Sequence, residues 1–142
     1  MANALRISEA AALALHAMAY LAEDPERTVS TRQLARQFRA SEAHLAKVLQ
    51  RLARQKLVTP LRGPAGGFVL ARPPQRISLL DVYEAIEGRF SCPVCLFVQP
   101  VCARRVCIMG GMVGMINRTL FKHLTTTRLS SLAKQRKKNQ KE

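Results

Sequence analysis

A helix–break–helix segment is the feature that most constrains how this chain can fold. Ser30 or Thr31 can cap a short helix, and Ser41 can cap a second helix after a tight break at 39–40. The second helix carries apolar residues at three- and four-residue spacing: Leu45, Val48, Leu49 and Leu52. A short helix, a tight break and an amphipathic second helix are typical of a helix-turn-helix.

The residues that follow extend this pattern to a winged helix. Two strands are predicted over 57–62 and 68–71, and the turn between them, 63–67, reads Gly-Pro-Ala-Gly-Gly. Basic helical hairpins and glycine-rich hairpins are also common in proteins that bind no nucleic acid, so neither feature is sufficient alone. Their succession predicts a mainly α fold with a small β wing, a winged helix-turn-helix.

The charge of the chain narrows the choice of partner. Lys and Arg exceed Asp and Glu by 23 to 9, a formal net charge of +14. Such an excess indicates nucleic acid or an anionic membrane surface. No apolar run approaches the roughly 18 residues of a spanning helix, which disfavours the membrane. Because the chain has two Tyr, five Phe and no Trp, a stacking platform for single strands is also disfavoured, and double-stranded DNA is predicted.

The rest of the chain suggests four parts. An Ala- and Leu-rich helix over 8–22, capped by Ser8, is predicted to be buried, and a further helix runs from Ser78 to Gly88. A helix over 113–124 has an apolar side that predicts a homodimer seam. The predicted boundaries are 1–88 for the DNA-binding domain, 89–109 for a cysteine-rich cofactor loop, 110–133 for the dimerisation helix and last turn, and 134–142 for a basic disordered tail.

All four cysteines lie in one short segment: Cys92, Cys95, Cys102 and Cys107. Pro93 and Pro100 prevent a continuous helix there, so the segment is loop backbone that can surround a ligand. The four thiolates can converge on an iron–sulfur cluster or on zinc, and the spacing alone does not separate these two. A thiol or disulfide switch, or cysteines that simply pack in a core, are the other interpretations.

The start of the chain bears on the chemistry of these thiols. It shows no basic segment followed by an apolar core and a cleavage site, so a cytoplasmic location is predicted. In a reducing compartment, clustered thiols indicate metal binding or redox chemistry more often than structural disulfides. Paired carboxylates in a cleft-like context, a nucleophile–histidine motif and a phosphate loop are all missing from the sequence, so an enzyme is not expected.

Taken together, these motifs resemble the Rrf2 family of bacterial transcription regulators. The resemblance rests on LV at 57–58, RGPAGGFVLA at 62–71, ISLLDV at 77–82, EG at 87–88 and the clustered cysteines, and it extends to about residue 132. It implies a homodimeric winged-helix regulator, often a repressor, with a long C-terminal dimerisation helix. The family includes an iron–sulfur cluster regulator and a nitric-oxide-sensitive repressor. In such sensing members, three cysteines before that helix hold an iron–sulfur cluster.

By position, the resemblance places Cys107 at the last family cysteine, Cys102 at the middle one, and Cys95 or Cys92 at the first. The acidic ligand of the nitric-oxide-sensing type falls on Ala12, and no histidine closely follows Cys107 as in the cluster-assembly type. The extra cysteine offers a fourth thiolate instead. We therefore expect an all-cysteine site for a 2Fe-2S or 4Fe-4S cluster, with zinc as the alternative.

The same resemblance assigns the DNA contacts. It places Ser41, Ala43 and His44 at the start of the recognition helix and Arg62 in the wing. Positive charge predicts phosphate contacts for Lys47 and Arg51. Gly66 would let the wing backbone approach the duplex closely.

The function predicted from all these features is a dimeric DNA-binding regulator. The cluster would modulate operator binding in response to redox, nitric oxide or iron–sulfur status. The alternative is a winged-helix regulator with a structural zinc or a thiol switch, or one that responds through a protein partner.

Overall fold

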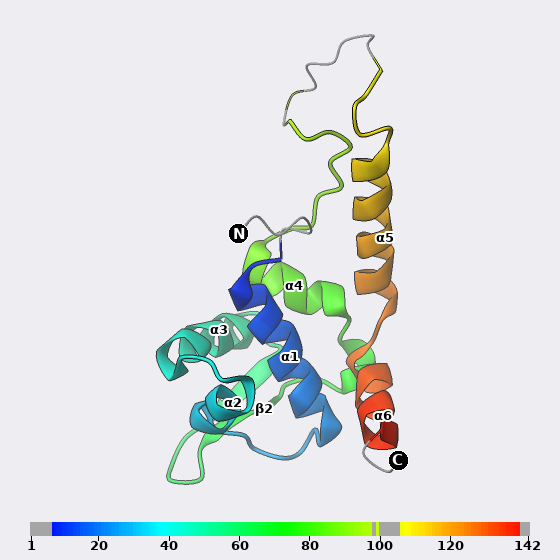
Figure 1. Cartoon of the computed structure of the whole chain (residues 1–142). Helices are drawn as coiled ribbons and strands as arrows, with labels where there is room; N and C mark the ends of the chain where they lie inside the picture. The colour runs from blue at the N-terminus through cyan, green and yellow to red at the C-terminus, as the bar shows by residue number, and fades with distance from the viewer. Residues whose placement is uncertain (1–6, 98, 100–105, 140–142) are drawn as a thin grey trace.

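The structure is a computed structural model that describes residues 7–97, 99 and 106–139 (Figure 1). The described chain is mainly helical and has a two-stranded sheet, which confirms the predicted fold class. In chain order the elements are α1 (Glu9–Glu23), α2 (Thr31–Phe38), α3 (Glu42–Arg54), β1 (Val58–Leu61), β2 (Gly67–Leu70), the 3-10 helix η1 (Pro74–Arg76), α4 (Leu79–Glu87), α5 (Met112–Thr126) and α6 (Leu129–Asn139).

Four serines start helices, as their sequence positions predicted. The hydroxyl oxygens of Ser8, Ser30, Ser41 and Ser78 each accept a hydrogen bond from the backbone N–H three residues later. Each such cap stabilises its helix by about 1 kcal/mol, because it pairs an amide that has no partner within the helix. The break between α2 and α3 is equally local, since Arg39 adopts a left-handed conformation at φ 51° and ends α2.

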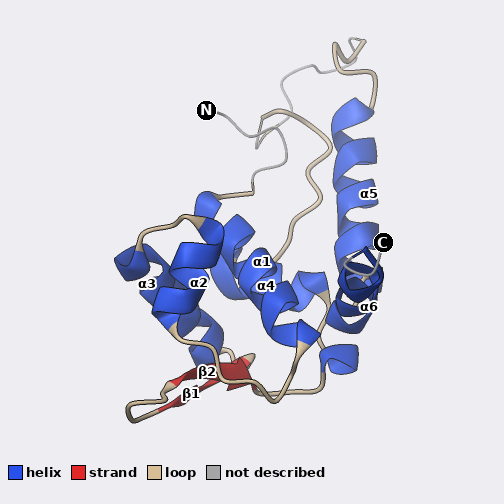
Figure 2. Ribbon diagram, turned by 60° about the horizontal axis from the view of Figure 1, so that its bottom comes forward, coloured by secondary structure: helices blue, strands red, loops and turns tan. Residues whose placement is uncertain are grey.

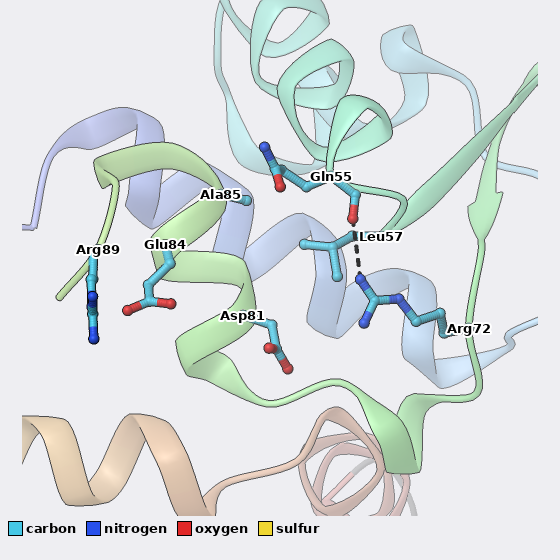
Figure 3. Close-up of a pocket in the computed structure, with 7 residues that line it drawn as sticks. All are labelled: Gln55, Leu57, Arg72, Asp81, Glu84, Ala85 and Arg89. Atoms are coloured by element: carbon cyan, nitrogen blue, oxygen red, sulfur yellow. Dashed lines mark hydrogen bonds between the residues drawn. The ribbon is translucent and has the colours of Figure 1, made fainter.

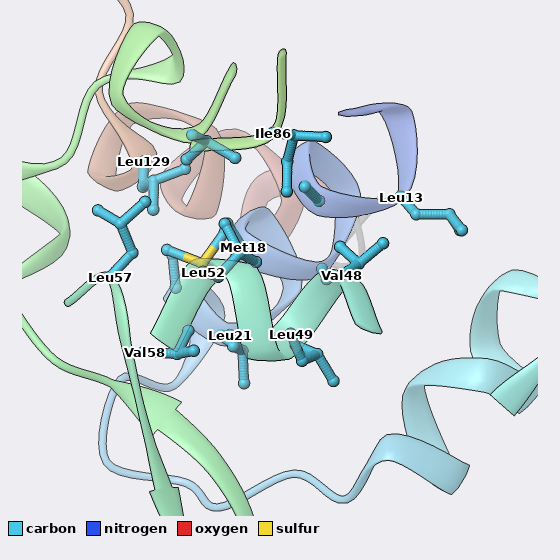
Figure 4. Close-up of a cluster of buried hydrophobic side chains, with 14 of the residues drawn as sticks. Leu13, Met18, Leu21, Val48, Leu49, Leu52, Leu57, Val58, Ile86 and Leu129 are labelled. Carbon is cyan, nitrogen blue, oxygen red and sulfur yellow. The ribbon is translucent and has the colours of Figure 1, made fainter. Parts of the chain in front are cut away.

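Helix α1 lies at the centre of the core. It contacts α3, α4 and α6, and its side chains Ala14, Ala17 and Met18 are fully buried. Figure 4 shows Met18 and Leu21 meeting Leu49 and Leu52 of α3. Alanines on several sides of one helix let neighbouring helices approach closely, so the apolar composition of this segment reflects burial on more than one face.

The wing is an antiparallel hairpin that extends away from the helices (Figure 2). Its register pairs Val58 with Leu70 and Leu61 with Gly67. Val29, in the segment before α2, forms two backbone hydrogen bonds of 3.0 and 2.8 Å with Phe68. The base of the wing is therefore attached to the helix-turn-helix as well as to its own strands.

Helix α6 differs from the prediction for the end of the chain. The tail was expected to be disordered from residue 134, but the helix continues to Asn139. Leu129 is fully buried, Ala133 is nearly so, and both belong to the core that includes α1. Burial of this part of the helix offsets the cost of helix nucleation, which an isolated basic segment would have to meet alone. The Ala, Lys, Gln and Arg residues that follow have high helix propensity and continue the helix.

The segment before α6 also pairs with the segment before α4. The backbone N–H of Leu79 donates to Thr127 at 3.0 Å, and that of Leu129 donates to Ile77 at 3.0 Å. Residues 127–129 thus pair with the backbone at the start of α4. The hydrophobic core therefore includes residues from both ends of the described chain, and the predicted boundary at residue 88 stays a prediction.

Helix α5 confirms the helix predicted over 113–124 and runs slightly further. The hydroxyls of Thr125 and Thr126 donate to the carbonyl oxygens of Phe121 and Lys122, and the helix ends at Thr127. Leu124 is buried against the core, while the amino end of α5 stands apart from the helices (Figure 1). None of the described helices is long and apolar enough to cross a membrane.

Shortening Leu129 to alanine tests whether α6 is part of the core. Because the side chain is fully buried, we expect the free energy of unfolding to fall by about 2–5 kcal/mol. Urea unfolding followed by circular dichroism measures this change. Leu61→Ala is the matched control, since Leu61 is 44% exposed and should change stability by no more than about 0.5 kcal/mol. Equal effects of the two substitutions would contradict the docking of α6.

Candidate nucleic-acid interface and cysteine loop

The outward face of α3 is polar and basic. Its inner face buries Leu45, Val48, Leu49 and Leu52, and its exposed side chains include Ala43, Lys47, Gln50 and Arg54. Ser41 starts the helix by accepting the His44 amide at 3.3 Å, and His44 itself is half-buried. Ser41, Ala43 and Lys47 thus lie at the exposed surface of α3, where they were predicted to meet DNA.

Two arginines on α2 extend this basic surface and were not predicted. An open hollow between α2 and the start of α3 is lined by Arg32, Ala35, Arg36, Ala40 and Glu42. The Arg32 Nε lies 3.7 Å from the Glu42 Oε2, and both side chains are more than half exposed. An exposed ion pair of this kind contributes little to stability, so Arg32 can exchange it for a phosphate at small cost. The feature that could have identified these two arginines in the sequence is their position on the side of α2 away from the buried Leu34 and Ala35.

The wing places Arg62 at the surface directly after β1. Gly66 is required by the turn itself, because a Cβ there would lie 2.6 Å from the Leu61 carbonyl oxygen and 2.7 Å from that of Gly63. The Gly66 amide also donates to Gly63 at 2.9 Å, which closes the turn. The fold therefore accounts for glycine at 66, and its contact with DNA stays a prediction.

Arg51 is exposed on α3 and also contacts α4. Its guanidinium donates a hydrogen bond to the carbonyl oxygen of Ile86, near the end of α4. This side chain joins two helices of the same chain and is still exposed. The predicted phosphate contact of Arg51 stays a prediction.

A polar hollow of about 420 Å³ lies between the end of α3 and helix α4 (Figure 3). Arg72 spans one side of it and donates to the carbonyl oxygens of Gln55 and Lys56, both at 3.1 Å. On α4, Asp81 accepts the Ser78 amide at 2.8 Å and Glu84 accepts the Phe90 amide at 2.8 Å. These three charged side chains hold helix ends in place, so the hollow is part of the scaffold that supports α3.

The described cysteines do not form a completed metal site. Cys92, Cys95 and Cys107 are free thiols, and Cys102 lies outside the described residues. Cys95 and Cys107 line one small apolar cavity of about 30 Å³, which Cys92 does not line. In the part of the chain that the structure describes, no three His, Cys, Asp or Glu side chains come together as metal ligands. The soft thiolate donors still suit iron or zinc, and two of them face the same space.

The segment between the first two cysteines is docked on α5. The Asn117 side-chain amide donates to the carbonyl oxygen of Pro93 at 2.8 Å. Val94 lies over Gly114, where an added Cβ would be 3.3 Å from Val94 Cγ1. Gly114 therefore permits the close approach of the loop to the helix.

Cys107 is close to the amino end of α5. Hydrogen bonds from the backbone amides of Met109 and Gly111, with a smaller contribution from Gly110, lower the pKa of the Cys107 thiol below its ordinary value. Amides that converge on a sulfur favour the thiolate, the form that binds metals and reacts with oxidants.

Comparison with known proteins places the chain among bacterial regulators. The model of the Rrf2 family, described as iron-dependent transcriptional regulator, matches residues 7–135. BadM of Rhodopseudomonas palustris, classed as an HTH-type transcriptional regulator, is 39% identical over 58% of this chain and 53% of BadM. The HTH-type transcriptional regulator NsrR of Bacillus subtilis is 27% identical over 72% of this chain and 70% of NsrR. The matched part of the chain thus spans 53% of BadM's length and 70% of NsrR's.

Solved structures show the same fold. CymR, the global cysteine regulator of B. subtilis, superimposes with a TM-score of 0.75 at 28% identity, over 92% of this chain and 97% of CymR. The T. potens IscR structure gives a TM-score of 0.73 at 24% identity, over 96% of this chain and 91% of that one. The latter likeness concerns the fold alone.

The pKa of Cys107 can be tested by alkylation of the metal-free protein. A lowered pKa means that the thiolate is present at lower pH than in the unfolded chain. The rate of iodoacetamide labelling at Cys107, followed by peptide mass spectrometry, should therefore rise at lower pH in the folded protein than in urea. The same residue in urea is the control. An identical pH midpoint in both states would show that the amides do not stabilise the thiolate.

Proposed function

The chain belongs to the Rrf2 family of transcriptional regulators, and from that premise we propose that it binds an operator duplex as a homodimer and adjusts this binding through its cysteine loop. Its relatives are helix-turn-helix regulators and not enzymes, in agreement with the absence of catalytic motifs noted above. The observation that carries the DNA-binding part is the exposed basic face of α3 beside the wing.

In this proposal α3 enters the major groove and the wing reaches the adjacent minor groove. Ser41, Ala43 and His44 lie at the amino end of α3, the end of a recognition helix that contacts base edges. Lys47 and the α2 arginines meet phosphates, which position the protein without reading sequence. Arg62 suits the negative potential of a narrow minor groove.

The apolar side of α5 supports a homodimer. Met112, Met115 and Phe121 are 46, 51 and 39% exposed, which is unusual for large apolar side chains. A shallow groove on the same helix is lined by Met115, Ile116, Thr119, Leu120 and His123. A second copy of this helix would cover that surface around a two-fold axis, and two recognition helices would then address two half-sites.

An iron–sulfur cluster, 2Fe-2S or 4Fe-4S, is our proposed cofactor for the cysteine loop. Cys95 and Cys107 line one cavity, and Cys92 and Cys102 belong to the same segment of the sequence, 92–107. When bound, such a cluster supplies one-electron redox chemistry and reactivity toward nitric oxide. The chain's own contribution would be the amide-stabilised thiolate of Cys107 and the docking of Pro93 and Val94 on α5.

A thiol switch is the second candidate function, and one observation favours it. Cys95 and Cys107 line the same cavity, and amides already favour the thiolate of Cys107. Such a pair can respond to oxidants without any metal. A structural zinc, or a response through a protein partner, would use the same DNA-binding surface.

Replacing Lys47 by methionine tests the DNA interface. Removing one phosphate contact should weaken binding to all duplexes and reduce the slope of log affinity against log salt by about one unit. Fluorescence anisotropy over a salt series measures both quantities. Arg62→Ala is the contrasting variant, which should chiefly reduce the preference for a selected duplex over a random one. An affinity of the native protein that does not depend on salt would rule out this interface.

The visible spectrum of anaerobically purified protein tests the cofactor. A brown solution with thiolate-to-iron absorption bands is expected, and Cys107→Ser should weaken those bands. Ala103→Ser, in the same loop, is the matched control and should leave the spectrum unchanged. Colourless protein with stoichiometric zinc would refute the cluster and support a structural metal. Colourless, metal-free protein would leave the thiol switch as the function of the loop.

A further inference from the structure

Arg51 occupies an unusual position for a basic residue on a recognition helix. It lies one turn after Lys47, yet its guanidinium donates to the Ile86 carbonyl oxygen on α4. The last four carbonyl groups of a helix have no partner within that helix, and positive charge is favourable at that end. The contact therefore satisfies a carbonyl group at the end of α4 and engages the guanidinium of Arg51 within the protein, although the residue is exposed like Lys47 and Arg54.

The end of α4 is in turn joined to the start of the cysteine loop. Gly88 ends the helix at φ 81°, and two residues later the Phe90 amide donates to the Glu84 carboxylate at 2.8 Å. The Phe90 ring lies 5.3 Å from the Tyr83 ring and 5.4 Å from the Phe121 ring, centre to centre. Phe90, two residues before Cys92, thus packs against both α4 and α5.

Helix α5 continues the connection into the cysteine segment. Asn117, one turn before Phe121, donates to the Pro93 carbonyl oxygen at 2.8 Å. Three contacts therefore connect the elements in turn: Arg51 joins α3 to α4, Phe90 joins α4 to α5, and Asn117 joins α5 to Pro93 between the first two cysteines. Helices α4 and α5 themselves link one contact to the next. A change in how the loop lies on α5 would reach the recognition helix through these contacts.

We propose that Arg51 is a positioning residue, which ties the recognition helix to the α4–α5 junction that carries the cysteine loop, and that it makes no phosphate contact. This inference rests on the proposed DNA-binding function for its consequence, but its structural part stands on the Arg51–Ile86 contact alone. A guanidinium offers several donors in a fixed geometry, so it can hold a helix end in one orientation.

The experiment compares Arg51→Met with Lys47→Met in the full-length protein. Both substitutions remove one positive charge from α3, but only the first removes the contact with α4. Amide hydrogen exchange over residues 79–90, measured without DNA, should accelerate in Arg51→Met and stay unchanged in Lys47→Met. This readout depends on the tether and not on any nucleic acid.

DNA binding supplies the second readout. The probes are a random-sequence 30-base-pair duplex and a duplex that the native protein enriches from a randomised pool. Arg51→Met should leave the salt slope on the random duplex unchanged and weaken binding to the enriched duplex by roughly tenfold, the change expected if the untethered helix holds its binding orientation about a tenth of the time. Lys47→Met should weaken both and lower the slope by about one unit.

A further substitution tests the connection to the loop. Phe90→Leu keeps an apolar side chain but removes the ring contacts with Tyr83 and Phe121. Its effect on the enriched duplex should not add to that of Arg51→Met, because both interrupt one path. Full additivity of the two effects would break the proposed connection.

The outcomes separate the two proposals. If Arg51→Met lowers the salt slope as Lys47→Met does, or leaves hydrogen exchange of residues 79–90 unchanged, Arg51 is not a positioning residue. If the native protein binds neither duplex, the proposed DNA-binding function fails, while the exchange measurement still decides whether the tether exists.

Discussion

The burial of α1 is the interaction on which the other elements depend. Its alanines Ala14 and Ala17 are fully buried, and small side chains let α3, α4 and α6 all lie close to one helix. Because α3 rests on this support through Leu45, Leu49 and Leu52, its opposite face is left for solvent and for a partner. A larger residue at these alanine positions would separate the helices and move the recognition helix with respect to the wing.

The recognition helix is held at both of its ends as well as along its buried face. Ser41 caps its start, and Arg72 stabilises its end by donating hydrogen bonds to the carbonyl oxygens of Gln55 and Lys56. The wing is attached to the segment before α2 through Val29 and Phe68. Helix-turn-helix and wing are therefore held together by contacts that lie outside the exposed face of α3.

The local features could be predicted because short-range chemistry determines them. Serine caps, the left-handed Arg39 and Gly66 of the wing act within a few residues, and the predicted helices and hairpin followed from them. Arg51 could not be placed in this way, because its partner is 35 residues further along the chain. The helix α6 could not be predicted either, because its basic composition favours disorder and its stability comes from the burial of Leu129 and Ala133 in the core.

The sequence by itself determined the winged-helix pattern, the basic character of the surface and the grouping of thiols in one loop, since periodicity, charge and cysteine spacing can be read without contacts. Tertiary structure decided which basic residues face outward, that Gly66 closes a turn, and that Cys95 and Cys107 share a cavity. The physical reason is that the role of a side chain depends on its neighbours. The neighbours that contact Arg51 and bury α6 come from distant parts of the chain.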